Sequence, residues 1–366
     1  MAALLDLAPE TPRDAAAPTA RPRLRLHDQD VDALFEPALW HALAEAVGDC
    51  EWWRCARSPE LGLSTADAAT LRRTLATDGF AAIERPPPWN CDLAGLARVA
   101  DVLAAHDYPP SFLLAYAAPW TIPAQLAPAV AAATGGDAFT GDVVAIRVEP
   151  GGRGFGPRRD RQPEDVAATF RDDGAPRSCT AWVPLRRATP ANGCLYVVPK
   201  SCDASYDGDG DGDDARDPVK AALGGDAPQY QMVRALPVAA GGVVLLSHRV
   251  VHWGGAAAKD HGEAPRVALS MAFADPDVEP ALFADGVPTT PPPLDARVAL
   301  AAAQQIVYAK SDARRPHDLA LFHRIFRARA ELFAPWLRAK VSERFQWMEC
   351  LSVCLVLTVY HAVTAS

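Results

Sequence analysis

Residues 241–255 read GGVVLLSHRVVHWGG, and this stretch is the strongest indicator of the fold. A run of Val and Leu that begins after two glycines is typical of a buried β-strand. If the strand continues to the second histidine, His248 and His252 share a face but lie ~13 Å apart at ~3.3 Å per residue. Two imidazoles so far apart cannot bind one ion at the ~2.1 Å of a metal–nitrogen bond. The stretch therefore predicts a buried strand on which only one histidine can serve a given metal.

Short apolar runs of the same kind occupy the middle of the chain on both sides of this stretch. They are rich in Val, Ile, Leu and aromatic residues, and Gly, Pro and Asp separate them. Short strands interrupted in this way are the signature of an all-β sandwich or barrel. The runs predict strands at 142–148, 178–185, 194–199, 231–238, 243–251 and 266–273.

Helical patterns flank the predicted barrel. Before it, residues 31–58 are rich in tryptophan, and an N-cap at Ser64 opens an amphipathic segment that stops at Gly79. Apolar residues recur every three or four positions in the segments 92–106 and 121–134, which is typical of helices. A short strand is expected at 80–84, and the sequence turns helical again from about residue 293.

These patterns divide the chain into three parts. The first is a disordered leader, the second is one large domain and the third is a helical extension packed on the barrel. The expected bounds are 1–28 for the leader, 29–290 for the domain (helices 29–135, barrel 136–290, acidic insertion 203–217) and 291–366 for the extension.

The acidic insertion alternates Asp and Gly over residues 207–214. Alternating carboxylates can wrap a calcium ion, but Pro218 stands where position 12 of a calcium loop requires Glu. A solvated surface insertion is therefore favoured over a calcium site.

Composition and charge exclude several classes of protein. The 366 residues are 49% hydrophobic and 22% charged, so the chain can bury a full core. Acidic residues outnumber basic ones by 45 to 36, and the net charge of −9 argues against a non-specific hold on nucleic acid or anionic membrane. The longest apolar run, 350–360, is shorter than the ~18 residues that span a bilayer. We expect no membrane span, a buried terminal helix or strand at this run, and a small-molecule partner.

Cysteine spacing and the N-terminus indicate the compartment. The eight cysteines include no C-x-x-C pair, so we expect reduced thiols rather than a zinc or redox site. Asp6, Glu10 and Asp14 stand where a secretory signal needs an unbroken apolar stretch. The sequence favours a cytoplasmic, intracellular protein, with organelle targeting by the leader as the weaker alternative.

Four motifs, taken in order, resemble a known family. They read GPRRD at 156–160, WVPL at 182–185 with NGCL at 192–195, HRVVHWGG at 248–255 and RVALSMAFA at 266–274. Over about residues 70–280 the chain resembles the phytanoyl-CoA dioxygenase family of Fe(II)/2-oxoglutarate oxygenases. The resemblance implies an α+β fold, in which helices pack outside a double-stranded β-helix, a jelly-roll or cupin-like barrel.

The resemblance also implies a ferrous ion held by His-x-Asp on one strand and a distant histidine on another. Asp160 and His252 match two of these three ligands, which leaves His248 as a neighbouring or core histidine. Arg158 stands at the position of the first histidine. A guanidinium has no acceptor lone pair and cannot coordinate a metal. It could instead pair with Asp160 and compete with the ion for that carboxylate.

The implied co-substrate site lies on the last strand of the barrel. Arg266 lies fourteen residues beyond His252, where the family places the arginine that grips the distal carboxylate of 2-oxoglutarate. Ser270 shares its strand face and could add a hydrogen bond, and Trp182 matches a position that lines the co-substrate pocket. The resemblance therefore implies Fe(II) and 2-oxoglutarate as cofactors, with O₂ and a small-molecule substrate as the other partners.

The implied reaction is oxidation, expected as hydroxylation, of a small organic or lipid-like substrate, with 2-oxoglutarate decarboxylated to succinate. The first alternative is a catalytically inactive member, in which Arg158 closes the iron site and the barrel serves as a binding or structural domain. The second is a metal-independent binding jelly roll that shares the fold alone.

Overall fold

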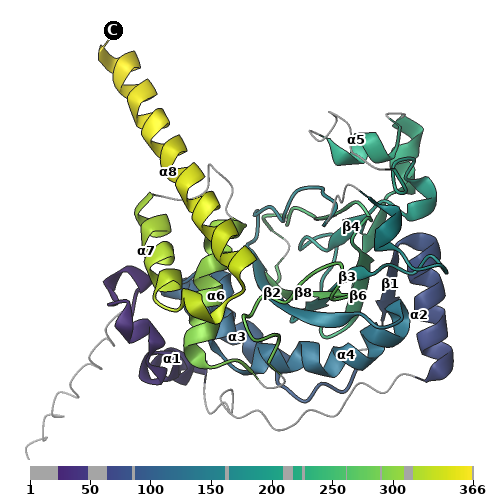
Figure 1. Ribbon diagram of the computed structural model, residues 1–366, viewed down its shortest axis with the longest axis horizontal. Coiled ribbons are helices and arrows are strands. Elements are labelled where there is room, and N and C mark those ends of the chain that lie inside the picture. The colour runs from purple at the N-terminus through teal and green to yellow at the C-terminus, as the bar shows by residue number, and fades with distance from the viewer. Residues whose placement is uncertain are drawn as a thin grey trace, which may run out of the picture.

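The computed structural model describes residues 24–47, 64–84, 87–160, 165–208, 217–224, 227–260, 262–288, 291–308 and 316–364. Two antiparallel sheets form its centre (Figure 1). The larger sheet has the strand order β1-β6-β3-β8-β2, and the smaller has β5-β4-β7. The strands are β1 Phe80–Ile83, β2 Ala138–Val148, β3 Ser178–Pro184, β4 Leu195–Val197, β5 Arg234–Leu236, β6 Val243–Ser247, β7 His252–Gly254 and β8 Arg266–Ala274.

The chain winds back and forth between the two sheets. It passes from β3 in the larger sheet to β4 and β5 in the smaller one, returns in β6, crosses again in β7 and ends in β8. Side chains from both sheets meet in one apolar cluster, in which Trp182 and Ala268 of the larger sheet join Leu195 of the smaller one. A chain wound through two facing antiparallel sheets is a jelly roll. The predicted α+β class with a double-stranded β-helix is confirmed.

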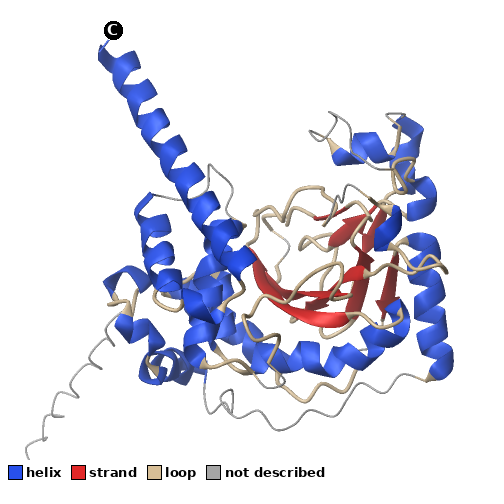
Figure 2. Cartoon of the chain, viewed as in Figure 1, coloured by secondary structure: helices blue, strands red, loops and turns tan. Residues whose placement is uncertain are grey.

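Helices lie below the sheets and on both sides of them in the view of Figure 2. Sequence signals fix several of their ends. Ser64 accepts a hydrogen bond from the Asp67 amide at the start of α2, and Gly79 ends that helix with φ 79°, as the sequence predicted. The helices are α1 Pro37–Ala44, α2 Thr65–Asp78, α3 Leu93–Ala105, α4 Thr121–Thr134, α5 Pro218–Ala222, α6 Leu294–Val307, α7 Pro316–Arg327 and α8 Pro335–Thr364.

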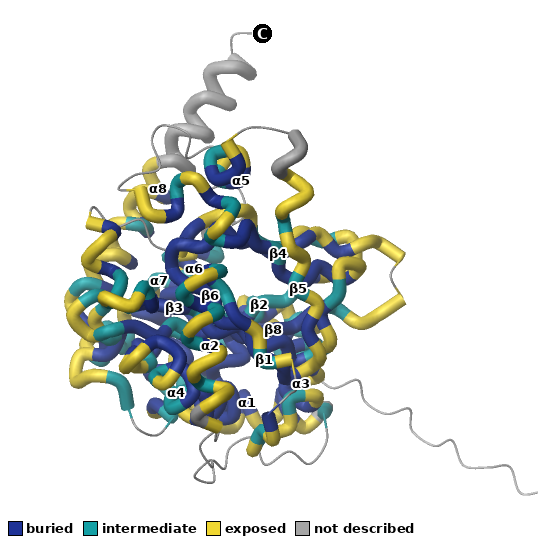
Figure 3. The backbone as a smooth tube through the Cα atoms, turned by 90° about the vertical axis from the view of Figure 1, so that its right-hand side faces the viewer, coloured by how far each residue is buried: buried dark blue, intermediate teal, exposed yellow. Residues whose placement is uncertain are grey.

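The larger sheet separates two cores, because alternate residues of a strand point to opposite faces. On β8, Val267, Leu269, Met271 and Phe273 pack among the helices in the main core. Ala268 points the other way, into the barrel. Figure 3 shows the buried backbone of the sheets enclosed by partly exposed helices. Side chains that line the barrel lumen are therefore the even-numbered residues of β8 and their neighbours across the sheet.

The prediction of one strand over 243–251 is wrong. The chain leaves the larger sheet after Ser247, turns, and enters the smaller sheet at His252. The turn is held by Arg249, a buried side chain that donates to the carbonyls of Ser205, Tyr206 and Gly208. Strong β-propensity at residues 250–251 concealed this corner, because propensity is a weak prior against tertiary contacts.

Smaller differences concern the ends of elements. Leu26 is buried in the main core within a short 3₁₀ turn, so ordered structure begins inside the expected leader. The strand expected at 231–238 shortens to β5, and that expected at 142–148 starts earlier, at Ala138. The apolar run 350–360 lies within α8, and its side chains from residue 351 onward fall outside the described part. Among the described residues, no helix is long and apolar enough to cross a membrane.

Candidate functional site

A short backbone ladder brings two of the predicted iron ligands together. The amide of Arg158 donates to the carbonyl of His252 at 3.1 Å, and the His252 amide donates to the Arg158 carbonyl at 3.0 Å. Two residues on, the Asp160 amide donates to the carbonyl of His248 at 3.0 Å. This register places His252 Nε2 3.4 Å from Asp160 Oδ1.

The imidazole of His252 has a defined orientation. Its Nδ1 lies 3.0 Å from the carbonyl oxygen of Val250, which can only accept, so Nδ1–H is the donor. In the neutral ring Nε2 then presents its lone pair toward Asp160. One ion with bonds of ~2.1 Å to each atom could bridge the 3.4 Å between them. The backbone carbonyl behind the ring is the kind of support that metal-ligating histidines use.

Asp160 is held in its ionised form. Burial raises the pKa of this carboxyl, but the charges of His252 and Arg158 and a hydrogen bond from Thr180 prevail and bring it below its usual value. The Thr180 hydroxyl donates to Oδ2 at 2.6 Å. Sequence reasoning missed Thr180, which lies two residues before Trp182 on the same face of β3. The carboxylate is therefore available to a cation at neutral pH.

Arg158 occupies the third position of the site. Its Nε lies 3.6 Å from Asp160 Oδ1, so the predicted pairing of the two side chains is confirmed. Its guanidinium carbon lies 4.4 Å above the ring of Phe155, which in turn meets the His252 ring edge-on. Among the described residues, no group of three His, Cys, Asp or Glu side chains could hold a metal ion. The site therefore offers two metal ligands, Asp160 and His252, and lacks the second histidine that the family resemblance implies.

His248 faces away from this pair. It is buried, with Nε2 2.7 Å from the Thr169 hydroxyl and Nδ1 3.0 Å from the carbonyl oxygen of Ser178. Both ring nitrogens are thus engaged by the loop that precedes β3. The placement agrees with the core histidine that the sequence predicted.

Arg266 is a fully buried cation. Its residue exposure is 0%, and among the residues that the structure describes Nε, Nη1 and Nη2 have no hydrogen-bond partner or counter-ion. Desolvation lowers the pKa of its guanidinium to about 10, partly offset by nearby Cys194, so it stays charged at neutral pH. An unpaired buried charge costs several kcal/mol, typically ~3–5. An anion bound next to Arg266 would remove this cost.

Trp182 lies beside this cation, and Ser270 pairs with Trp182. The Arg266 guanidinium carbon is 5.5 Å from the Trp182 ring, whose buried Nε1 also has no hydrogen-bond partner. Ser270 pairs directly with Trp182 across the sheet, and it is partly exposed on the lumen side. Gly254 closes the other side, because a Cβ there would lie 3.4 Å from Arg266 Nη2. The structure thus brings together the three residues predicted to bind 2-oxoglutarate.

The segment that carries Asp160 is anchored by a buried ion pair that sequence reasoning missed. Arg159 points away from the lumen and donates to Asp203 Oδ2 at 2.7 Å, with side-chain exposures of 1% and 0%. Asp203 and Tyr206, at the start of the segment 203–217 expected as an acidic insertion, are both buried. The Asp/Gly run itself lies outside the described residues from 209 onward. The sequence could not predict this ion pair, because Arg159 and Asp203 lie 44 residues apart.

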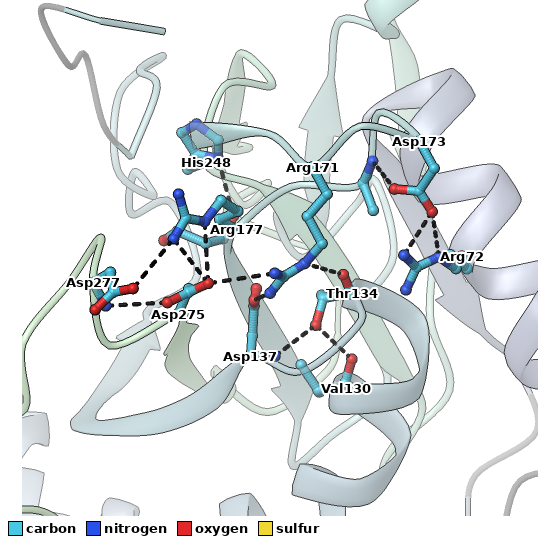
Figure 4. Close-up of polar contacts among 12 residues, drawn as sticks. Arg72, Val130, Thr134, Asp137, Arg171, Asp173, Arg177, His248, Asp275 and Asp277 are labelled. Carbon is cyan, nitrogen blue, oxygen red and sulfur yellow. Dashed lines mark hydrogen bonds and ion pairs between the residues drawn. The ribbon is translucent and has the colours of Figure 1, made fainter. Parts of the chain in front are cut away.

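A second network of ion pairs holds the loop before β3 (Figure 4). Arg171 donates to Asp137 at 2.5 Å and lies 3.3 Å from Asp275, which also pairs with Arg177 at 3.0 Å. Burial raises the pKa of Asp137 to about 6, although Arg171 opposes the shift. These contacts tie the loop before β3 to the start of β2 and the end of β8.

Asp137 should make stability depend on pH. Its folded pKa lies above its ordinary value of 3.8, so between about pH 4 and pH 6 the folded state binds the extra proton and the contribution of this group falls as pH rises. Lowering the pH from 7 to 4 should stabilise the wild type relative to Asp137→Asn by up to about 3 kcal/mol. Denaturant unfolding of both proteins across this range measures the difference, in which the other carboxylates cancel. A difference that does not vary with pH would contradict the assignment.

One jelly-roll barrel thus carries both a buried guanidinium and a histidine–carboxylate pair. The family predicted from the motifs is confirmed over residues 100–266, which match the sequence model of the phytanoyl-CoA dioxygenase (PhyH) family. A search of curated proteins found no match.

Three solved structures that are similar to this chain are described as dependent on 2-oxoglutarate or as containing it. The alpha ketoglutarate dependent epimerase SnoN from nogalamycin biosynthesis is 18% identical, with 58% of this chain and 82% of that chain covered and a TM-score of 0.42. The carbocyclase SnoK from the same biosynthesis is 18% identical, with 58% and 87% covered and a TM-score of 0.41. EctD from S. alaskensis, with 2-oxoglutarate and 5-hydroxyectoine, is 17% identical, with 63% and 81% covered and a TM-score of 0.40. Likenesses this distant assign no substrate to the present chain.

Proposed function

We propose that this protein is a 2-oxoglutarate-binding, oxygenase-like member of the family. Its proposed reaction is the oxidation, most simply the hydroxylation, of a small organic or lipid-like substrate, with decarboxylation of 2-oxoglutarate to succinate. One observation carries the proposal: Arg266 is fully buried and charged, and its three guanidinium nitrogens lack partners among the described residues. A carboxylate satisfies a planar fork of donors with two parallel hydrogen bonds.

The distance along β7 between His252 and Gly254 matches the length of a five-carbon dicarboxylate. Gly254 abuts the Arg266 guanidinium, and His252, two residues earlier on the same strand face, lies beside Asp160. Two residues of a strand span ~6.6 Å. The carboxyl carbons of 2-oxoglutarate are four C–C bonds apart, about 5 Å when extended at ~1.5 Å per bond. The distal carboxylate can therefore reach Arg266, with Ser270 and the Trp182 N–H as further donors, while the keto-acid end lies near His252.

The residues fit ferrous iron less well than they fit 2-oxoglutarate. Asp160 and His252 would hold the ion, and the ion would supply the activation of O₂ on which oxidation in this family depends. Arg158 cannot replace the missing imidazole as a ligand. Its guanidinium also neutralises part of the Asp160 charge that a metal would use.

The placement of Arg158 favours a second candidate function. In that alternative the family member is catalytically inactive, and the barrel binds a carboxylate ligand at Arg266 without turning it over. Contact between Arg158 and Asp160 is the observation that supports this reading.

Anaerobic titration with Fe(II) and 2-oxoglutarate separates the two functions. An oxygenase should develop the visible metal-to-ligand charge-transfer band of a chelated keto acid and release succinate when O₂ is admitted. An inactive binder should show no band while calorimetry still detects 2-oxoglutarate. Absence of both signals would contradict the proposed function.

A further inference from the structure

Arg158 lies near the residue that Arg266 contacts, two residues along β7. The Arg266 guanidinium abuts Gly254, and the backbone of Arg158 pairs with His252, two residues earlier on that strand. The Arg158 guanidinium lies over the ring of Phe155, whose carbonyl accepts a hydrogen bond from the Gly254 amide at 3.1 Å. Two guanidinium groups therefore lie along the path that 2-oxoglutarate is proposed to occupy.

The Arg158 side chain is free to change its contacts. Its exposed fraction is 52%, and its approach to Asp160 is 3.6 Å, longer than a hydrogen bond of good geometry. Exposed ion pairs of this kind contribute ~0–1 kcal/mol. A ligand carboxylate can therefore recruit the guanidinium at little cost, since Asp160 keeps its hydrogen bond from Thr180.

The balance of charge favours a dianion without a metal. Arg158 and Arg266 bring two positive charges to the lumen, and Asp160 brings one negative charge. The resulting charge of +1 becomes −1 when 2-oxoglutarate binds. Without Arg158 and without iron, the same step would take the lumen from neutral to −2.

We propose that Arg158 supplies the positive charge that an iron ion would bring to this end of the site. The barrel then binds 2-oxoglutarate between two arginines and needs no iron to do so. Arg266 holds the distal carboxylate, and Arg158 holds the carboxylate of the keto-acid end. This inference rests on the proposed function, because it assumes that 2-oxoglutarate is the ligand at Arg266. It assigns to Arg158 a role in binding, where the family pattern predicts a metal ligand.

Calorimetry of 2-oxoglutarate binding in a buffer with chelator tests the inference. Wild type is expected to bind without metal, Arg158→Gln at least tenfold more weakly, and Arg158→Lys between the two. Arg153→Gln is the matched control, because Arg153 is an exposed arginine on the same segment and its loss removes the same charge. Two truncated ligands locate the ends: 2-oxobutyrate, which lacks the distal carboxylate, should lose its dependence on Arg266, and glutarate, which lacks the keto group, should keep it.

The outcomes distinguish this inference from the proposed function. Binding that requires added Fe(II), or equal affinity in wild type and Arg158→Gln, would overturn the role of Arg158 and leave 2-oxoglutarate binding at Arg266 intact. No binding with or without Fe(II), or affinity unchanged in Arg266→Ala, would overturn the proposed function, and this inference with it. A tenfold loss in Arg153→Gln as well would show that only net charge matters, which also contradicts a clamp at Arg158.

Discussion

Replacement of Arg266 by alanine is expected to remove measurable binding of 2-oxoglutarate. The variant loses a two-pronged, charge-assisted contact and leaves a ligand carboxylate unpaired in a desolvated lumen. Truncating one partner of such a pair costs ~2–5 kcal/mol, which corresponds to a loss of roughly 30-fold to several thousand-fold in affinity. Titration calorimetry measures this loss directly. Arg266→Lys should recover only part of it, because an ammonium is a point charge and cannot match the fork geometry.

The ligand-free protein offers an independent check on the same residue. A buried guanidinium without partners opposes folding, so Arg266→Met should be at least as stable as wild type in the absence of ligand. Added 2-oxoglutarate should then raise the unfolding temperature of wild type and leave that of Arg266→Met unchanged. Equal 2-oxoglutarate affinity in wild type and Arg266→Ala would show that Arg266 is outside the site.

Arg158→His is expected to strengthen binding of Fe(II) by at least the ~10–100-fold that a supporting partner of a metal ligand contributes. The substitution places an imidazole beside Asp160 and His252, and so completes a two-histidine, one-carboxylate site. In the wild type Asp160 Oδ1 and His252 Nε2 are already 3.4 Å apart. It also removes a cation that helps to keep Asp160 ionised. At neutral pH that carboxylate stays ionised either way, because an aspartate ordinarily titrates near pH 4. The gain should therefore come from the added ligand.

Arg158→Ala separates the added ligand from the lost charge. It removes the guanidinium without supplying an imidazole, so its affinity for Fe(II) should rise much less than that of Arg158→His. Anaerobic titration of the three proteins, followed by metal analysis after gel filtration, gives the comparison. Equal affinity in all three would mean that residue 158 is not at the metal site and that the register between Arg158 and His252 is wrong.

Motifs carried by regular strands were predictable, because the register of a strand converts spacing in the sequence into position in space. Arg266 and Ser270 share a lumen face for this reason, and Trp182 pairs with Ser270 across the sheet. The corner after Ser247 was not predictable, because its cause is Arg249, which is held by carbonyls about forty residues earlier in the chain. The local sequence carries no sign of that contact.

Buried polar contacts between distant segments were the main omission. Arg159 looks like one more surface arginine in the sequence, yet it is buried against Asp203 and anchors the segment that carries Asp160. Thr180 follows the same pattern, because its hydrogen bond to Asp160 joins two strands whose proximity only the fold reveals. Residue type alone cannot identify such positions, since threonine and arginine are most often exposed.

The alternation of side chains along β8 makes this strand suitable for engineering substrate range. Its lumen face carries small side chains at Ala268, Ser270 and Ala272, and its helix face carries the large apolar ones that build the main core. A combinatorial library at Ala268 and Ala272 would change the barrel-facing surface of β8 and leave Ser270 in place. The packing beneath it would be preserved, because no randomised residue belongs to the helix-side core. Selectivity and thermal robustness could therefore be varied separately within a single nine-residue segment.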